Sequence, residues 1–100
     1  MNKEKDLANR KVIVMSKNGI HMRPGLMLVE LASRYVSNIT LDAPSGVGDA
    51  KSIMHVTMLC ILNGDEVTII AEGEDAQEAV EAIAELIESD FSKELIEDMG

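Results

Sequence analysis

A histidine and an arginine stand two residues apart where a predicted loop meets a predicted helix. The segment reads Asn18-Gly19-Ile20-His21-Met22-Arg23-Pro24. Pro24 suits the first turn of a helix, because the N–H group that it lacks would have no partner there. An apolar pattern of helical period follows from Leu26 to Tyr35. We therefore expect His21 to lie near the N-cap of this helix.

An imidazole in this position can exchange a phosphoryl group. The free N–H groups of the first turn and the helix dipole favour an anion and disfavour a proton on His21, and a neutral imidazole is a nucleophile. After phosphorylation, the fixed charge of Arg23 could form charge-assisted hydrogen bonds to the phosphoryl group. The spacing predicts reversible phosphoryl transfer, although so short a motif also occurs by accident around ordinary loop histidines.

The elements that must position His21 alternate along the chain. Strands are predicted at residues 11–15, 38–42, 47–50 and 66–71, where apolar and β-branched residues lie between turn residues. Helices are predicted at residues 24–35, 52–59 and from 75 onward. The order predicts an α+β domain in which three helices cover one face of a four-stranded antiparallel sheet, βαββαβα. We expect a flexible segment over residues 1–9, the domain over 10–91 and a tail over 92–100.

The periodicity of the helices assigns their faces. In the first helix we expect Leu28, Leu31, Ala32 and Tyr35 to face the core and Glu30, Ser33, Arg34 and Ser37 to face water. In the last helix we expect an apolar inner face of Ala76, Ala79, Val80, Ile83 and Ile87 and an outer face of Glu78, Glu81, Glu85 and Glu88. Asp75 and Glu78 have the spacing of a capping box. Leu26 and Met27 either pack or form an exposed apolar rim beside His21.

Ser52 precedes the second predicted helix and suits its N-cap. A phosphate added to a cap hydroxyl would meet favourable N–H groups, so the position also suits a regulatory modification.

Composition and charge exclude several classes of protein. The 100 residues are 46% hydrophobic, which indicates a single domain, and no apolar run approaches the length of a membrane span or signal segment. The only cysteine, Cys60, cannot form an internal disulfide, and its apolar surroundings favour a core position. We expect a cytoplasmic protein.

The net charge of −9 lies mainly in the second part of the chain. Residues 1–64 hold 8 basic and 5 acidic side chains, whereas residues 65–100 hold 1 basic and 13 acidic. With Tyr35 and Phe91 as its only aromatic residues, the chain lacks the basic field and the stacking groups of a nucleic-acid binder. His21 lies in the mildly basic part, where a phosphate is repelled less.

Two motifs resemble those of the HPr family, the histidine-containing phosphocarriers of the bacterial phosphoenolpyruvate-dependent phosphotransferase system. Gly19-Ile20-His21-Met22-Arg23-Pro24 resembles the active-site signature of the family, and Lys51-Ser52-Ile53-Met54 resembles its regulatory serine motif. The likeness covers roughly residues 10–90. It implies the HPr-like open-faced β-sandwich.

The resemblance also implies a role for each motif residue. The Nδ1 atom of His21 would accept a phosphoryl group from phospho-Enzyme I, which takes it from phosphoenolpyruvate, and pass it to a downstream EIIA-type component. Arg23 would steady that group and Pro24 would start the helix. Ser52 would be the target of HPr kinase/phosphorylase, and its modification would weaken exchange with Enzyme I or recruit a transcriptional regulator. The partner-binding surface would consist of Met22, Leu26, Met27, Ile53 and Met54.

The chain would thus be a monomeric carrier in a sugar-transport relay, with no enzymatic turnover, cofactor or metal of its own. It departs from the family pattern at Gly25, where alanine is usual, at His55, where glycine is common, and in the acidity of residues 65–100. Two alternatives remain open at this point. One is a regulatory paralogue similar to the nitrogen branch of the system. The other is a small ferredoxin-like ligand-binding or interaction module, which would have no need for His21 and Arg23.

Overall fold

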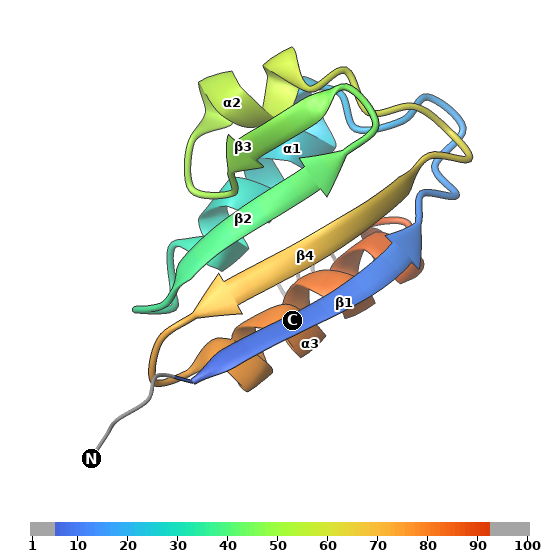
Figure 1. Ribbon diagram of the computed structural model, residues 1–100. Helices are drawn as coiled ribbons and strands as arrows, with labels where there is room; N and C mark the ends of the chain where they lie inside the picture. The colour runs from blue at the N-terminus through green and yellow to red at the C-terminus, as the bar shows by residue number, and fades with distance from the viewer. Residues whose placement is uncertain (1–5, 93–100) are drawn as a thin grey trace.

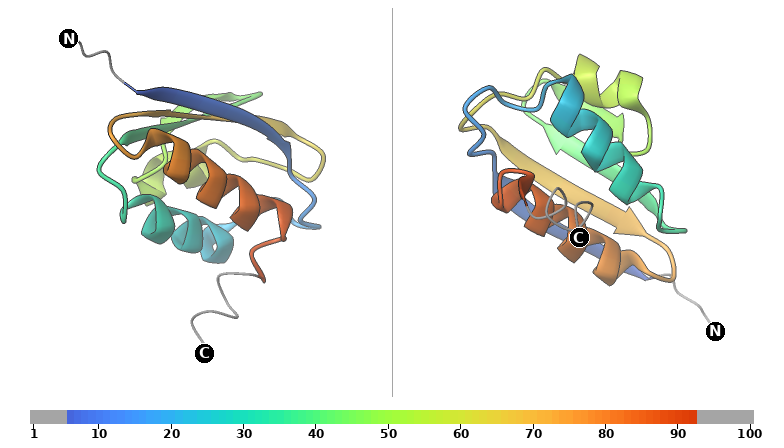
Figure 2. Two further views of the ribbon diagram at one scale, coloured as in Figure 1. Left: turned by 90° about the horizontal axis from the view of Figure 1, so that it is seen from below. Right: turned by 180° about the vertical axis from the view of Figure 1, so that it is seen from behind.

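The computed structural model describes residues 6–92, and these form a four-stranded sheet with three helices (Figure 1). The elements are β1 (Leu7–Ile13), α1 (Met22–Ala32), β2 (Asn38–Ala43), β3 (Gly46–Asp49), α2 (Ile53–Met58), β4 (Glu66–Glu72) and α3 (Ala76–Glu88). The strands pair antiparallel in the order β1-β4-β2-β3. All three helices cover one face of the sheet and leave the other open (Figure 2). The predicted fold is confirmed.

The largest error in the predicted boundaries is at β1. The strand begins at Leu7, four residues before the expected start, because its pairing with β4 continues to the pair formed by Leu7 and Glu72. Residues 7–9, predicted to be flexible, therefore belong to the sheet, and the strand ends at Ile13, before Met15. The bounds of β2, β3 and β4 lie within one residue of those predicted. Residues 1–5 and 93–100 of the two predicted terminal segments lie outside the described residues.

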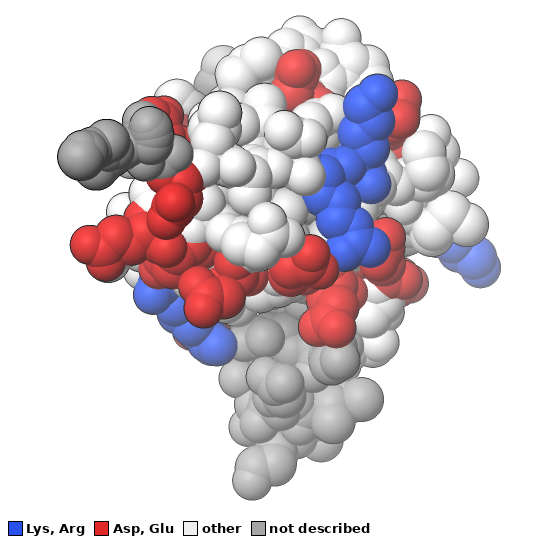
Figure 3. Space-filling model, turned by 60° about the horizontal axis from the view of Figure 1, so that its bottom comes forward, with Lys and Arg blue, Asp and Glu red and all other residues white. Residues whose placement is uncertain are grey.

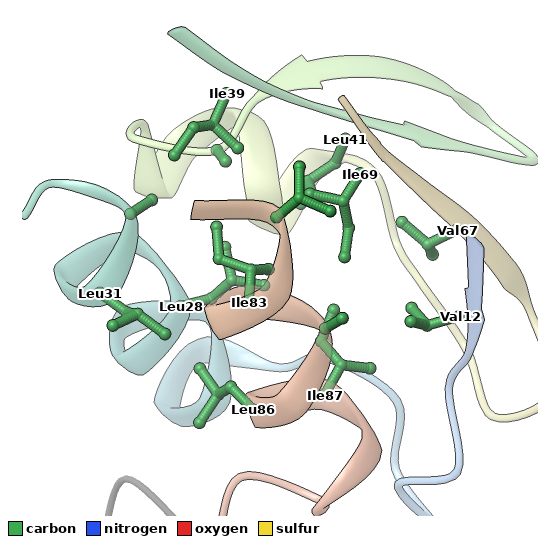
Figure 4. Close-up of a cluster of buried hydrophobic side chains, with 14 of the residues drawn as sticks. Val12, Leu28, Leu31, Ile39, Leu41, Val67, Ile69, Ile83, Leu86 and Ile87 are labelled. Carbon is green, nitrogen blue, oxygen red and sulfur yellow. The ribbon is translucent and has the colours of Figure 1, made fainter. Parts of the chain in front are cut away.

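The core fills the space between the inner face of the sheet and the helices (Figure 4). In β2 and β4 alternate residues point inward, so that Ile39, Leu41, Val67 and Ile69 are fully buried. The predicted inner residues of α3 are all buried, and its four predicted outer glutamates are exposed. Burying each large aliphatic side chain contributes about 1.5–3 kcal/mol, which makes this layer the main source of stability. None of the helices within residues 6–92 has the length and apolarity needed to cross a bilayer.

The acidic outer face of α3 is tied to the edge of the sheet. Arg10 in β1 forms ion pairs with Glu81 at 3.0 Å and Glu88 at 3.2 Å. Acidic side chains form a band across the side of the molecule on which β1 and α3 lie, with basic side chains among them (Figure 3). Because these pairs are largely exposed, each contributes about 1 kcal/mol at most.

Ser37 and Asp75 differ from their predicted roles. The helix α1 ends at Ala32 instead of Tyr35, so Ser37 no longer follows the helical pattern and is buried, with 1% of its surface exposed. Asp75 occupies the N-cap of α3 without a side-chain capping bond. Its carboxylate instead accepts hydrogen bonds from the N–H groups of Val36 and Ser37, each at 3.0 Å, and from the Ser37 hydroxyl. Asp75 therefore fixes the connection between α1 and β2.

Cys60 is exposed, which contradicts its predicted core position. The helix α2 ends at Met58, and Cys60 follows its C-cap with a left-handed backbone, φ +49°. This turn directs the thiol outward. Its neighbours Leu59 and Ile61 occupy the buried positions.

Replacing Asp75 with asparagine should destabilise the protein in a pH-dependent way. The hydrogen bond from the Ser37 hydroxyl, aided by the backbone N–H groups, holds the pKa of Asp75 below its usual value. A lowered pKa in the folded state means that the stabilisation is present above about pH 4 and is lost as the pH falls through the folded-state pKa. In urea unfolding at neutral pH, the free energy of unfolding of Asp75→Asn should be lower than that of wild type, and this difference should become smaller in acid. The exposed Asp42→Asn variant is the control, and a deficit independent of pH would contradict the assignment.

Replacing Ser52 with alanine should cost about 1 kcal/mol, because α2 would lose its N-cap. The Ser52 Oγ atom accepts a hydrogen bond from the backbone N–H of His55 at 3.2 Å. Ser33→Ala is the matched control, because Ser33 is an exposed serine at the C-cap of α1. Equal unfolding midpoints for Ser52→Ala and Ser33→Ala would show that the hydroxyl caps nothing.

Candidate functional site

His21 occupies the N-cap of α1, as predicted. Its backbone is extended, with φ −87° and ψ −166°, and its carbonyl oxygen accepts the first helical hydrogen bond from Gly25 at 2.8 Å. The side chain is exposed and forms no capping bond. The imidazole is therefore presented to solvent by a backbone that is itself held in the helix.

The loop that leads to His21 is anchored against the segment after α2. Gly19 has a left-handed backbone, φ +71°, and a Cβ atom at this position would lie 2.2 Å from the carbonyl oxygen of Ile61. The next residue, Ile20, donates its N–H to the same oxygen at 3.0 Å and is buried. Only glycine allows this close approach, so the loop holds His21 in a fixed place.

The first turn of α1 is suited to an anion. Met22 and Arg23 supply backbone N–H groups that have no acceptor within residues 6–92, and Pro24 completes the turn without one. The Arg23 side chain is exposed and forms no ion pair with the described residues. The dipole of α1, these two N–H groups and the Arg23 guanidinium all favour negative charge beside the imidazole. A phosphoryl group on His21 would meet these groups.

Apolar side chains surround this site. Met22, Leu26 and Met54 are exposed, with 58%, 50% and 66% of their surfaces accessible, and Ile53 is half-buried. They are brought together because α1 and α2 pack closely at Gly25, where an added Cβ would lie 3.3 Å from the Ile53 Cδ1 atom. The sequence did not decide whether Leu26 and Met27 are packed or exposed. In the structure Leu26 is exposed, and Met27 packs against the core.

The exposed apolar residues that were not singled out from the sequence include Met15, Met58 and Leu62. Met58 follows Met54 by one helical turn, and that spacing was a signal that could have found it. Met15 and Leu62 lie in loops, where periodicity gives no indication of exposure.

Ser52 is the N-cap of α2, as predicted, and is half-buried. The neighbouring Lys51 ammonium donates to the carbonyl oxygen of Tyr35 at 2.7 Å, which ties this turn to the segment between α1 and β2. His55, three residues after Ser52, is exposed on the first turn of the helix. Residues 6–92 contain no group of three or more His, Cys, Asp and Glu side chains that could hold a metal ion.

Comparison with known proteins identifies relatives over most of the chain. The family model described as PTS HPr component phosphorylation site matches residues 8–89. The chain is 43% identical over 77 residues to the phosphocarrier protein HPr of Mycoplasma capricolum subsp. capricolum, covering 77% of this chain and 86% of that protein. It is 38% identical over 84 residues to the HPr-like protein Crh of Bacillus subtilis, covering 84% of this chain and 99% of that protein.

A solved structure agrees with these relatives. The crystal structure of HPr-C-His from Thermoanaerobacter tengcongensis superposes with a TM-score of 0.81 at 35% identity, covering 85% of this chain and 96% of that chain. Sequence and fold thus agree over the part that carries His21, Arg23 and Ser52. The chain belongs to the HPr family of phosphocarrier proteins of the phosphotransferase system.

Proposed function

We propose that the chain carries a phosphoryl group on the Nδ1 atom of His21. In the proposed reaction the Nδ1 lone pair attacks the phosphorus atom of phospho-Enzyme I, and the bond from phosphorus to the donor breaks as the new bond forms. The same exchange in the next step passes the group to a downstream component of EIIA type. The observation that carries the proposal is the exposed imidazole at the N-cap of α1, beside two N–H groups and the Arg23 guanidinium, which have no partner among residues 6–92.

The proposed relay requires little of this protein beyond positioning. Each partner brings its own phosphoryl donor or acceptor, so the chain acts as a substrate and then as a donor, as a cytoplasmic monomer without a cofactor. Arg23 is placed to stabilise the charge of the transferred group by charge-assisted hydrogen bonds. Pro24 lacks an N–H group at a position where that group would have no helical partner, and its ring presets the backbone for the helix.

We assign partner recognition to the apolar surface formed by Met22, Leu26, Met27, Ile53 and Met54. Its exposed methionines support this role, because flexible and polarisable side chains can pack against several partners in turn. Met27 is half-buried, because it packs against the core.

We further propose that Ser52 is a regulatory phosphorylation site for HPr kinase/phosphorylase. Its hydroxyl is half-buried at the N-cap of α2, on the side of the molecule where α2 packs against α1 (Figure 1). A dianion added here would lie close to the proposed partner surface and would alter docking by Enzyme I or by a transcriptional regulator.

A regulatory circuit is the second candidate, favoured by the 40% identity to the solved structure of Crh, described as the Bacillus subtilis catabolite repression HPr. In that circuit the phosphorylation state of the chain would act as a signal instead of supplying sugar import. Family membership replaces the earlier alternative of a ferredoxin-like module.

Replacing His21 with alanine should abolish phosphoryl acceptance without unfolding the protein, because the side chain is exposed and makes no capping bond. The measurement is the intact mass after incubation with Enzyme I and phosphoenolpyruvate, before and after brief acid treatment. Wild type should gain one acid-labile phosphoryl group, and His55→Asn should gain it as well. A gain of one phosphoryl group by His21→Ala would refute the assignment of the site to His21. If wild type gains no phosphoryl group with a competent Enzyme I, the regulatory circuit is favoured.

Replacing Arg23 with alanine should slow transfer by about tenfold or more, the range expected when a charge-assisted hydrogen bond to the transferred group is lost. Rapid-quench measurement of label transfer from phospho-Enzyme I gives the rate. Lys17→Ala removes an exposed positive charge from the loop that precedes the site and serves as the control. If the two variants slow transfer equally, Arg23 contributes only general charge.

A further inference from the structure

Two loops run side by side at one end of the sheet (Figures 1 and 2). Residues 14–20 lead from β1 to His21 and are called the His21 loop below, and residues 59–65 lead from α2 to β4. Backbone hydrogen bonds join both ends of the His21 loop to the second loop: Val14 N–H to the Asp65 oxygen at 2.9 Å, Gly64 N–H to the Val14 oxygen at 2.7 Å, and Ile20 N–H to the Ile61 oxygen at 3.0 Å.

The middle of the His21 loop is held by a side chain. The Nδ2 atom of Asn63 donates to the carbonyl oxygen of Ser16 at 3.0 Å. Within residues 6–92, this is the only hydrogen bond that joins residues 15–19 to another segment. A carbonyl oxygen can only accept, so the amide end of the Asn63 side chain is the end that faces it.

The Ser16 carbonyl oxygen is also the acceptor that closes the turn before His21. It accepts the N–H of Gly19 at 3.0 Å, and its second lone pair is free for Asn63. Gly19 is the residue that lies against the Ile61 carbonyl oxygen. Asn63 therefore holds this turn from the side opposite to Gly19.

The turn that carries Asn63 is itself fixed at both ends. The Asp65 N–H donates to the Leu62 carbonyl oxygen at 3.0 Å, and the Asp65 carboxylate accepts the Leu62 N–H at 2.8 Å. Gly64 supplies the left-handed backbone, φ +91°, that the turn needs between them. The Asn63 side chain thus extends from a rigid support.

We propose that Asn63 is a positioning residue for phosphoryl transfer at His21. It acts through the Ser16 carbonyl group and the turn before Gly19, and it takes no part in making or breaking a bond to phosphorus. Transfer requires the nucleophile in a narrow range of positions, so an imidazole at the end of a looser loop reaches the donor less often in the reactive geometry. The inference deepens the proposed function and rests on it.

The loss of this bond should affect the rate more than the stability. Asn63 is exposed and Ser16 is half-buried, so water can bind the Ser16 carbonyl oxygen when the carboxamide is removed. Water satisfies the carbonyl group but does not connect it to residues 62–65. The turn is then free to move, while the free energy of unfolding changes little.

The test compares Asn63→Ala with Asn38→Ala, which removes an exposed asparagine at the other end of the sheet, where Asn38 pairs with Glu72. Rapid-quench transfer from phospho-Enzyme I at several concentrations of the chain separates the maximal rate from KM. Asn63→Ala should lower the maximal rate about threefold to tenfold, the range for one lost neutral hydrogen bond, and leave KM unchanged.

Asn38→Ala should change neither quantity, and the two variants should have equal midpoints in urea unfolding. An unchanged maximal rate for Asn63→Ala, or a change in KM alone, would overturn the proposal.

Hydrogen exchange of the Gly19 amide, read by NMR, tests the same bond without Enzyme I. The amide should exchange about threefold faster or more in Asn63→Ala than in wild type and Asn38→Ala, because the turn that protects it has lost its support. Equal protection in all three proteins would show that the loop is held without Asn63 and would overturn the inference. Failure of the proposed function would appear separately, as no phosphoryl gain by wild type with a competent Enzyme I.

Discussion

The carbonyl oxygen of Ile61 occupies the space that a side chain at residue 19 would need, and the position of His21 depends on this contact. Gly19 meets the oxygen with a left-handed backbone, and Ile20 hydrogen-bonds to it. The loop before α1 is thereby fixed to the segment after α2. Without it, the imidazole would sit on a mobile loop, and each transfer would have to order that loop first. With it, the proposed nucleophile is presented in one orientation.

The helices α1 and α2 each have one side buried in the core and one side exposed to solvent. Leu28 of α1 and Val56 of α2 are fully buried, while Met22, Leu26 and Met54 are exposed. The absence of a side chain at Gly25 lets α1 and α2 approach closely enough to form one apolar surface. Among the three helices of residues 6–92, only α1 and α2 expose large apolar side chains. The outer face of α3 is lined by glutamates instead.

The acidic outer face of α3 and the proposed phosphoryl site lie on different helices. The glutamates of α3 gather on the side where it packs against β1, and Arg10 neutralises part of their charge (Figure 3). His21 lies instead at the start of α1, where the helix end and Arg23 favour an anion.

The sequence alone determined the features that depend on neighbours along the chain. The N-cap positions of His21 and Ser52, the alternation of β2 and β4 and the two faces of α3 follow from local patterns of side chains. Tertiary structure decided the features that join distant segments. The side chain of Asp75 does not cap α3, because its carboxylate accepts hydrogen bonds from Val36 and Ser37. Cys60 is exposed because α2 ends in a left-handed turn.

The start of β1 and the bond between His55 and Asp49 were likewise decided by tertiary structure. Leu7 enters the sheet because Glu72 of β4 lies beside it, and the His55 imidazole finds its donor only where β3 ends against α2. The residue pattern within one segment does not indicate which distant residue it will bind. A hydrogen bond between two segments depends on their relative placement in space. The sequence determined which residues can do the chemistry, and the packing of segments far apart in the chain decided what holds them in place.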